Sequence, residues 1–188
     1  MQPPEAIVVG CSQGSFHALR IFLSGLDRRL TQTLLICCHT SSDVSALCDL
    51  LASHSTLPIV EARERQPAVG GTVHMAPAGY HLLVENDRHF ALSVDEHVRY
   101  SRPSIDVMFG SATDVYGASL IGVVLTGANS DGAEGLARIR RRGGVAVVQT
   151  PEGAEAPAMP RAALEKAGAD YCLPLEQIAP LLNRLCLA

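Results

Sequence analysis

The first two dozen residues carry the feature that most constrains the fold, an apolar run that changes abruptly into a helix through small residues. Residues 7–9 (Ile-Val-Val) are continuously apolar, as in a strand that is buried on both faces. Residues 10–14 then read Gly-Cys-Ser-Gln-Gly, and Leu19, Phe22 and Leu23 follow at helical spacing. A strand that turns this sharply into a helix needs glycines at the bend. The stretch therefore predicts the first strand–helix unit of a parallel sheet.

The serine of this turn stands between two glycines in the order Gly-x-Ser-x-Gly. In a strand–turn–helix unit, that geometry exposes the Ser12 hydroxyl at the carboxyl edge of the sheet, beside the unpaired N–H groups of the helix. Such N–H groups suit a developing oxyanion, and Gln13 and Gly14 are the candidates for supplying them. The alternative is an ordinary turn of small residues whose serine only caps the helix.

Nucleotide-binding loops also use glycine-rich turns, but this sequence argues against them. The dinucleotide fingerprint is Gly-x-Gly-x-x-Gly, whereas Gly10 and Gly14 are four residues apart and Ser15, Phe16 and His17 come next. No acidic residue ends the second predicted strand, and Gly-Lys-Ser/Thr does not occur. We therefore expect no nucleotide, and no other cofactor is predicted.

Length and composition set the outer limits. A chain of 188 residues fits one domain, 1–188, with a substantial core. The net charge of −4 gives no electrostatic case for nucleic acid, and no apolar run is long enough for membrane insertion. The N-terminus lacks a signal-peptide pattern, and the six cysteines show no disulfide spacing. We therefore expect reduced thiols and a cytoplasmic location.

The remaining chain alternates strand and helix patterns. Strands are predicted at 33–38, 57–60, 118–125, 145–148 and 171–173. Helices are predicted after the caps Ser41-Ser42-Asp43, from Ser104 to about Tyr116, before Gly143 and Gly168, and around 178–185. A loop is predicted at 154–160. Shorter patterns between residues 70 and 99 predict an antiparallel hairpin, turning at 85–88 and appended to the main sheet. The alternation predicts a three-layer α/β/α fold, doubly wound around a mostly parallel sheet.

Three chemically capable side chains follow predicted strands. Ser12 follows the first strand, His39 follows the second, and Asp131 lies in the loop after the strand at 118–125. Because the carboxyl ends of neighbouring parallel strands share one crevice, the three can converge. A serine nucleophile needs a histidine to take its proton, and the histidine needs a carboxylate to fix its tautomer. The trio therefore predicts a catalytic triad, although singly His39 fits a satisfied strand-end histidine and Asp131 a helix cap.

Neighbouring cysteines offer two alternatives. Cys37, Cys38 and His39 form a run of metal-ligating types, but adjacent strand residues face opposite sides of a sheet, so we expect no metal. Cys11 is a rival nucleophile that we expect to point into the sheet. The order Ser…His…Asp also differs from the Ser…Asp…His of α/β-hydrolases, which argues against a lipase-like fold.

Five segments resemble the catalytic domain of CheB-type protein-glutamate methylesterases of bacterial chemotaxis. They are residues 9–14, the strand leading to His39, residues 74–81 (His-Met-Ala-Pro-Ala-Gly-Tyr-His), 102–106 (Arg-Pro-Ser-Ile-Asp) and 125–135, with Met-Pro-Arg at 159–161 as a further match. The resemblance implies a three-layer α/β/α domain with Ser12 as nucleophile, His39 as base and Asp131 as orienting acid. The implied reaction removes methyl esters from glutamates of chemoreceptors, and some members also deamidate receptor glutamines.

Three departures from the family pattern lie around this expected site. Ser15 replaces a glycine, residues 40–43 replace a Met-Pro stretch, and Ala128-Asn129 replace Met-Gly before the acid. They leave the trio intact but predict a changed oxyanion pocket and changed receptor contacts. Arg102 is a candidate for contacting substrate or for orienting the loops.

Two rival functions stay open. A non-catalytic module could keep the fold and bind a receptor or signalling protein, and a serine hydrolase for small esters would use an exposed apolar pocket. The resemblance is to a family with a phosphorylatable receiver domain, and we expect none here, because the first core strand starts at about residue 6. We therefore expect a cleft that is open by default. The expected partner is the cytoplasmic region of a methylated chemoreceptor or another signalling protein.

Overall fold

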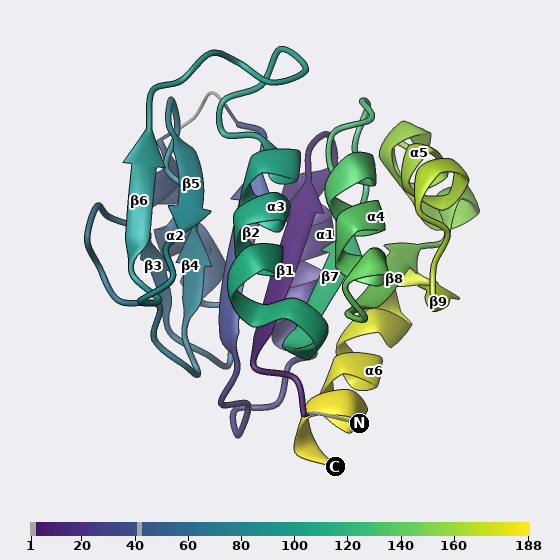
Figure 1. Cartoon of the computed structure of the whole chain (residues 1–188). Helices are drawn as coiled ribbons and strands as arrows, with labels where there is room; N and C mark the ends of the chain where they lie inside the picture. The colour runs from purple at the N-terminus through teal and green to yellow at the C-terminus, as the bar shows by residue number, and fades with distance from the viewer. Residues whose placement is uncertain (1–2, 41–42) are drawn as a thin grey trace.

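The computed structural model describes residues 3–40 and 43–188, which fold around a seven-stranded sheet with all neighbouring strands parallel (Figure 1). The strand order is β3-β4-β2-β1-β7-β8-β9, so the first strand of the chain is the central one. Its strands are β1 Ala6–Cys11, β2 Thr33–Cys38, β3 Ile59–Glu61, β4 Val73–Met75, β7 Leu120–Val124, β8 Val145–Gln149 and β9 Tyr171–Leu173.

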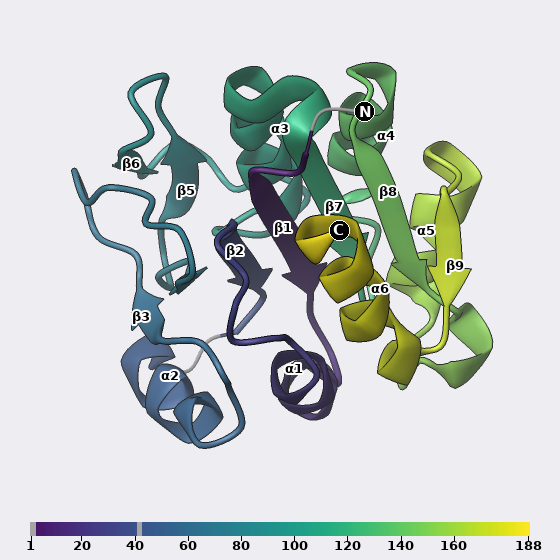
Figure 2. The ribbon, with the colours of Figure 1, turned by 90° about the horizontal axis from the view of Figure 1, so that it is seen from below.

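Helices cover both faces of this sheet. They are α1 Ser15–Ser24, α2 Val44–Ala52, α3 Ile105–Tyr116, α4 Ala133–Arg141, α5 Ala158–Lys166 and α6 Leu175–Leu187. Figure 2 shows α1, α2 and α6 on one face and α3, α4 and α5 on the other. The predicted three-layer α/β/α fold is therefore confirmed. Within the described ranges, no helix combines the length and the apolar character needed to span a bilayer.

The apolar runs of the sequence are buried because the central strand is covered on both sides. Ile7 and Val9 belong to the core cluster shared with α1 and α6, whereas Ala6 and Val8 belong to the cluster shared with α3. Full burial of such an aliphatic side chain contributes about 1.5–3 kcal/mol relative to exposure. A strand in this position must be apolar at every residue, which is the pattern that the sequence shows.

The predicted hairpin exists, but it forms a sheet of its own. Strands β5 His81–Val84 and β6 Phe90–Ser93 pair antiparallel and pack beside α3, while the preceding strand β4 joins the main sheet. Leu82 and Phe90 bury their side chains in the α3 cluster. The hairpin thus extends the helical layer rather than the parallel sheet.

Some predicted boundaries differ from the observed ones. The loop predicted at 154–160 is wrong beyond Pro157, because α5 begins at Ala158 and a proline at position 160 is tolerated in a first helical turn. The third strand starts at Ile59 instead of residue 57, and a 3-10 turn at 117–119 precedes β7. Asp43 caps α2 by accepting from two backbone N–H groups, while Ser41 and Ser42 lie outside the described residues.

Candidate active site

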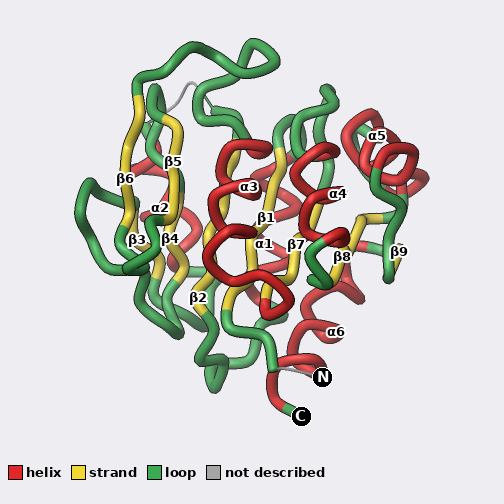
Figure 3. Tube along the Cα trace, in the orientation of Figure 1, coloured by secondary structure: helices red, strands yellow, loops and turns green. Residues whose placement is uncertain are grey.

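The strand order brings the predicted catalytic side chains to one end of the sheet. β1 lies between β2 and β7, so Ser12, His39 and the loop with Asp131 follow three adjacent parallel strands at their carboxyl ends. The His39 N–H donates to the Cys11 carbonyl (3.1 Å), and the Ser12 N–H donates to the Thr126 carbonyl (2.9 Å). In Figure 3 the β6–α3 and β7–α4 loops lie at this same end of the molecule.

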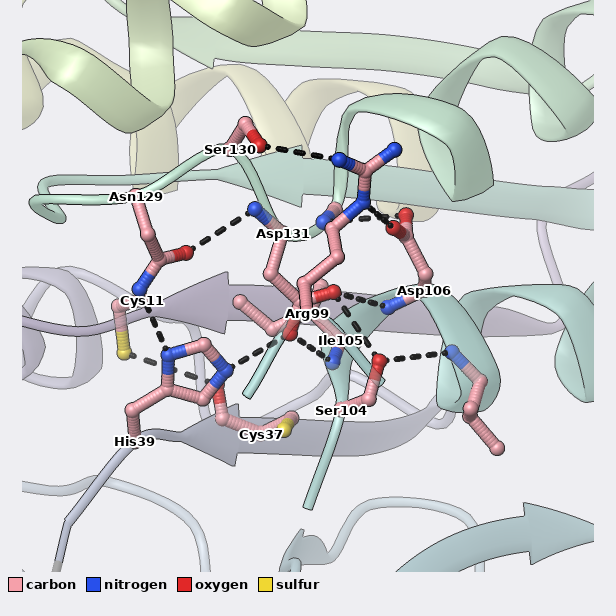
Figure 4. A network of polar contacts seen from close by, with 12 residues as sticks. Cys11, Cys37, His39, Arg99, Ser104, Ile105, Asp106, Asn129, Ser130 and Asp131 are labelled. Atoms are coloured by element: carbon pink, nitrogen blue, oxygen red, sulfur yellow. Dashed lines mark hydrogen bonds and ion pairs between the residues drawn. The ribbon is translucent and has the colours of Figure 1, made fainter. Parts of the chain in front are cut away.

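His39 and Asp131 form a direct pair. His39 Nε2 lies 2.7 Å from Asp131 Oδ2; the histidine side chain is 13% exposed and the aspartate side chain is fully buried (Figure 4). A buried carboxylate that accepts from Nε2 fixes the neutral ring as the Nε2–H tautomer. The other ring nitrogen, Nδ1, is then the one that can take a proton.

Asp131 is held by the N-terminus of α3. Its Oδ1 accepts from Ser104 Oγ (3.0 Å) and the Asp106 N–H (2.9 Å), and its Oδ2 also accepts from the Ile105 N–H (2.7 Å). Burial acts to raise the pKa of Asp131, but the His39 and backbone donors outweigh it and hold that pKa below its ordinary value. The carboxylate therefore stays ionised beside the histidine, stabilised by the positive end of the helix.

A second layer of contacts positions this helix end. Ser104, which caps α3, donates its backbone N–H to Nδ1 of buried His81 (3.2 Å), and His81 Nε2 contacts the Glu96 carbonyl (2.9 Å). Sequence reasoning identified Ser104 only as the start of a helix and gave His81 no role. The signal was available in the motif at 102–106, but only the packed structure shows that this motif meets Asp131.

Asp106 joins the same helix end to α4. Its Oδ1 accepts from the N–H groups of Gly132 (3.0 Å) and Gly135 (2.7 Å), and its Oδ2 lies 3.4 Å from Arg99 Nε. Burial, together with the nearby Asp131 charge, raises the pKa of Asp106 to about 6. The carboxylates of Asp106 and Asp131 thus lie close together at the N-terminus of α3.

The Ser12 turn is attached through its backbone. Thr126 Oγ1 donates to the Gln13 carbonyl (2.9 Å), and Gly14 adopts the left-handed conformation (φ 80°) that starts α1. Among the described residues, no hydrogen bond joins the Ser12 hydroxyl to His39, and the N–H groups of Gln13 and Gly14 have no partner. The geometry leaves these donors available at the helix N-terminus, and their role with an oxyanion stays a prediction.

The cysteines beside the site do not suit the alternatives raised for them. Cys11 is buried, and its hydrogen bond with Cys38 together with burial raises its pKa well above the ordinary value, which disfavours a thiolate nucleophile. Cys37 and Cys38 pack in different core clusters on opposite faces of the sheet, so they do not converge on one ion. Cys38 also contacts Ser15 Oγ (3.1 Å).

An open hollow of about 420 Å³ borders His39 and is lined by His97, Tyr100 and Arg102 among others. Arg99 and Tyr100 have positive φ angles (49° and 65°), and the Tyr100 side chain is fully exposed at this turn. Such backbone strain is typical of loops with a binding role.

Arg102 lies at the rim of this hollow but is committed to its own loop. Its Nη1 donates to the carbonyls of Val94 (2.8 Å) and Asp95 (3.1 Å). These contacts suit the loop-orienting alternative, and substrate contact by Arg102 stays a prediction.

Known proteins match both the sequence and the fold of this chain. The family model for CheB methylesterase matches residues 7–182. The chain belongs to the CheB methylesterase family. The predicted family resemblance is therefore confirmed over almost the whole chain.

Relatives and a solved structure extend this match. A Leptospira interrogans protein is 45% identical over 186 residues, covering 96% of this chain and 94% of that protein. A protein-glutamate methylesterase/protein-glutamine glutaminase of Symbiobacterium thermophilum is 33% identical, and the protein-glutamate methylesterase FrzG of Myxococcus xanthus is 34% identical. These two alignments cover 97% and 96% of this chain but only 51% and 54% of the relatives. The Thermotoga maritima CheB methylesterase catalytic domain superposes with a TM-score of 0.92 at 26% identity, covering 98% of this chain and all of that one.

Proposed function

We propose that this protein is a serine hydrolase that removes methyl esters from glutamate side chains of chemoreceptor-type proteins in the cytoplasm. The observation that carries the proposal is the His39–Asp131 pair, 2.7 Å apart on strand ends that adjoin the Ser12 turn. The substrate class comes from the relatives, which are named protein-glutamate methylesterases. The proposed partner is the methylated cytoplasmic region of a chemoreceptor.

The chemistry follows from the two nitrogens of His39. Ser12 Oγ attacks the ester carbon while its proton passes to His39 Nδ1, because Nε2 is held by Asp131. The C–O bond to the methoxy group breaks, the Nδ1 proton leaves with it as methanol, and a glutamyl ester of Ser12 remains. Water then gives a proton to Nδ1 and attacks this ester, which releases the glutamate carboxylate and restores Ser12.

Other residues of the site can stabilise the charges that form in this reaction and accommodate the substrate. The Gln13 and Gly14 N–H groups lie at the start of α1, where a negatively charged oxygen is favoured. The buried Asp131 stabilises the imidazolium that forms on His39. The open hollow beside His39 suits a side chain presented by a protein surface better than a small ester enclosed in an apolar pocket.

A methanol-release assay on methylated chemoreceptor, with Ser12→Ala as blank, tests the proposal. A fluorophosphonate probe should label Ser12, and His39→Ala should suppress the labelling. Ser15→Ala is the matched control, because Ser15 belongs to the same turn but its hydroxyl contacts Cys38. Labelling of Cys11, or of Ser15, contradicts the assignment. Ammonia release from receptor glutamines in the same samples tests deamidation as a second activity.

The non-catalytic rival has one observation in its favour. In the described residues the Ser12 hydroxyl is not hydrogen-bonded to His39, whose Nδ1 contacts Asn129 instead. A folded protein that binds methylated receptor but neither labels with the probe nor releases methanol above the Ser12→Ala blank supports a binding module.

A further inference from the structure

Asn129 occupies the histidine nitrogen that the proposed reaction needs. Its Nδ2 lies 3.1 Å from His39 Nδ1, on the opposite side of the ring from Asp131, as Figure 4 shows. Asn129 lies two residues before Asp131, in the loop between β7 and α4.

The orientation of the Asn129 amide is determined at both ends. Its Oδ1 accepts from the backbone N–H of Asp131 (3.0 Å), so the NH₂ group faces the ring. The ring in turn carries its proton on Nε2, because Nε2 lies against the ionised Asp131. Nδ1 is therefore an acceptor, and the contact is an amide N–H donating to the Nδ1 lone pair.

This contact conflicts with the general-base step. The lone pair that accepts from Asn129 is the one that must accept the Ser12 proton. Once His39 is protonated, Nδ1–H and the Asn129 NH₂ are two donors facing each other, so the contact is favourable only with the neutral ring. Asn129 is only half-buried and lies between exposed Ala128 and Ser130, so its side chain has room to leave.

We propose that Asn129 is a positioning residue that holds His39 Nδ1 in the free protein and competes with Ser12 for it. This inference rests on the proposed serine hydrolase function, whose regulation it describes. In the free protein the neutral His39 ring is held between Asn129 and Asp131. Productive substrate binding displaces the amide, and Nδ1 then becomes the base for Ser12.

Two substitutions at this position separate competition from simple bracing of the loop. Asn129→Ala removes the competing donor, so fluorophosphonate labelling of Ser12 and kcat/KM should rise about 2- to 10-fold, the range for loss of one neutral hydrogen bond. Asn129→Asp keeps an oxygen for the Asp131 N–H but places a carboxylate at Nδ1, which holds a proton there and should lower both rates. The expected order is therefore Ala, then Asn, then Asp.

A bracing role predicts the opposite order. If Asn129 acts only through its bond to the Asp131 N–H, Asn129→Asp should resemble wild type and Asn129→Ala should be slower, and that result overturns the proposal. Asn86→Ala is the matched control, because Asn86 is exposed in the distant β5–β6 turn.

Imidazole ¹⁵N NMR tests the contact without any turnover. With the ring neutral, the Nδ1 resonance of His39 should differ between wild type and Asn129→Ala, because only the wild-type nitrogen accepts from an amide. Coincident resonances overturn the proposal, whatever the catalytic result. Absence of labelling and methanol release in all variants instead refutes the serine hydrolase function, while the NMR comparison still decides whether Asn129 holds the ring.

Discussion

The two halves of the candidate site are built in different ways. The carboxylate half is closed: Asp131 is fully buried and accepts four hydrogen bonds, three of them from the first residues of α3 and its cap. The serine half is open: the turn is attached through backbone contacts to Thr126, and the Ser12 hydroxyl makes no hydrogen bond within the described part of the chain. The protein thus holds the Asp131 carboxylate in place and leaves the Ser12 hydroxyl free to meet a substrate.

The physical reason lies in the different demands on the two groups. A buried charge without hydrogen bonds costs several kcal/mol, so Asp131 is tolerated only with its acceptor positions filled. A nucleophile that was equally satisfied would have to break those bonds before it reacted. The difference between the halves can be tested by substitutions that act on one and spare the other.

Loss of the Asp131 charge should have the largest effect. Asp131→Asn keeps the size of the side chain but gives it an NH₂ group that must face some of the four donors. Serine proteases lose about 10⁴-fold in kcat on the equivalent change, and we expect a loss of that order in methanol release. The variant should also unfold more easily, by about 1–3 kcal/mol, because buried donors lose their acceptor.

The matched control is Asp114→Asn, which removes an exposed carboxylate paired with Arg138 on the surface. Its activity should remain close to wild type, since exposed ion pairs contribute about 0–1 kcal/mol. If Asp131→Asn lowers the rate of methanol release only a few-fold and leaves stability unchanged, Asp131 serves only to hold the helix contacts. The proposed difference between the two halves of the site would then be wrong.

Sequence reasoning succeeded where one local property decided the outcome. The strand at 33–38 was predicted with its observed bounds, because a strand buried on both faces is apolar throughout and ends where polar residues begin. His39 was identified for the same reason, as the first polar residue after that strand. The start of α5 differs from the loop predicted through residue 160, because a proline is tolerated in the first turn of a helix.

Side-chain contacts between segments far apart in the sequence could not be predicted from such local patterns. The bond from Ser104 Oγ to Asp131 joins residues 27 positions apart, and it depends on how α3 docks against the β7–α4 loop. The Asn129–His39 contact spans 90 positions and depends on the side-chain conformation of a loop residue. Residue type and spacing gave the candidates, and packing determined which of their atoms meet.

The Asp106 carboxylate should make the closed half sensitive to pH. Its folded-state pKa of about 6 lies above its ordinary value of 3.8, so its protonation stabilises the fold at low pH, and this contribution is lost as pH rises through 6. An asparagine at position 106 does not titrate, so the stability of Asp106→Asn does not fall in this way as pH rises. Its amide oxygen can still accept from the Gly132 and Gly135 N–H groups. Between pH 4 and pH 7, the wild type should therefore lose roughly 2 kcal/mol of stability relative to the variant.

Urea unfolding of both proteins at pH 4, 5, 6 and 7 measures this difference. Other titrating groups are common to the two chains, so they cancel in the comparison. If the unfolding free energies of the two proteins run parallel over the whole pH range, the pKa of Asp106 is not elevated. Asp106 would then stay ionised in the folded protein, stabilised by its ion pair with Arg99.

Gly10 allows a smaller test of how the central strand supports the closed half. A Cβ at this position would lie 2.5 Å from Cγ2 of Ile105, the residue whose N–H holds Asp131. Gly10→Ala should therefore cost about 1–3 kcal/mol of stability and slow labelling of Ser12, because α3 must shift. Gly153→Ala is the control, since a Cβ there meets nothing within 4 Å. Normal labelling in a destabilised Gly10→Ala protein would separate the α3 position from catalysis.

The smallest effect is expected at Arg102, on the rim between the two halves. Its guanidinium holds the carbonyls of Val94 and Asp95, so Arg102→Ala should loosen the β6–α3 loop and lower kcat/KM only a few-fold. Limited trypsin digestion reports the loosening directly, because the exposed Arg99–Tyr100 bond lies in this loop and should be cut faster in the variant. A rise in KM with unchanged cleavage at Arg99 would instead mean that Arg102 contacts the substrate. Faster cleavage with a normal KM would mean that the rim only shapes the hollow, and that recognition of a methylated side chain belongs to the open, serine half of the site.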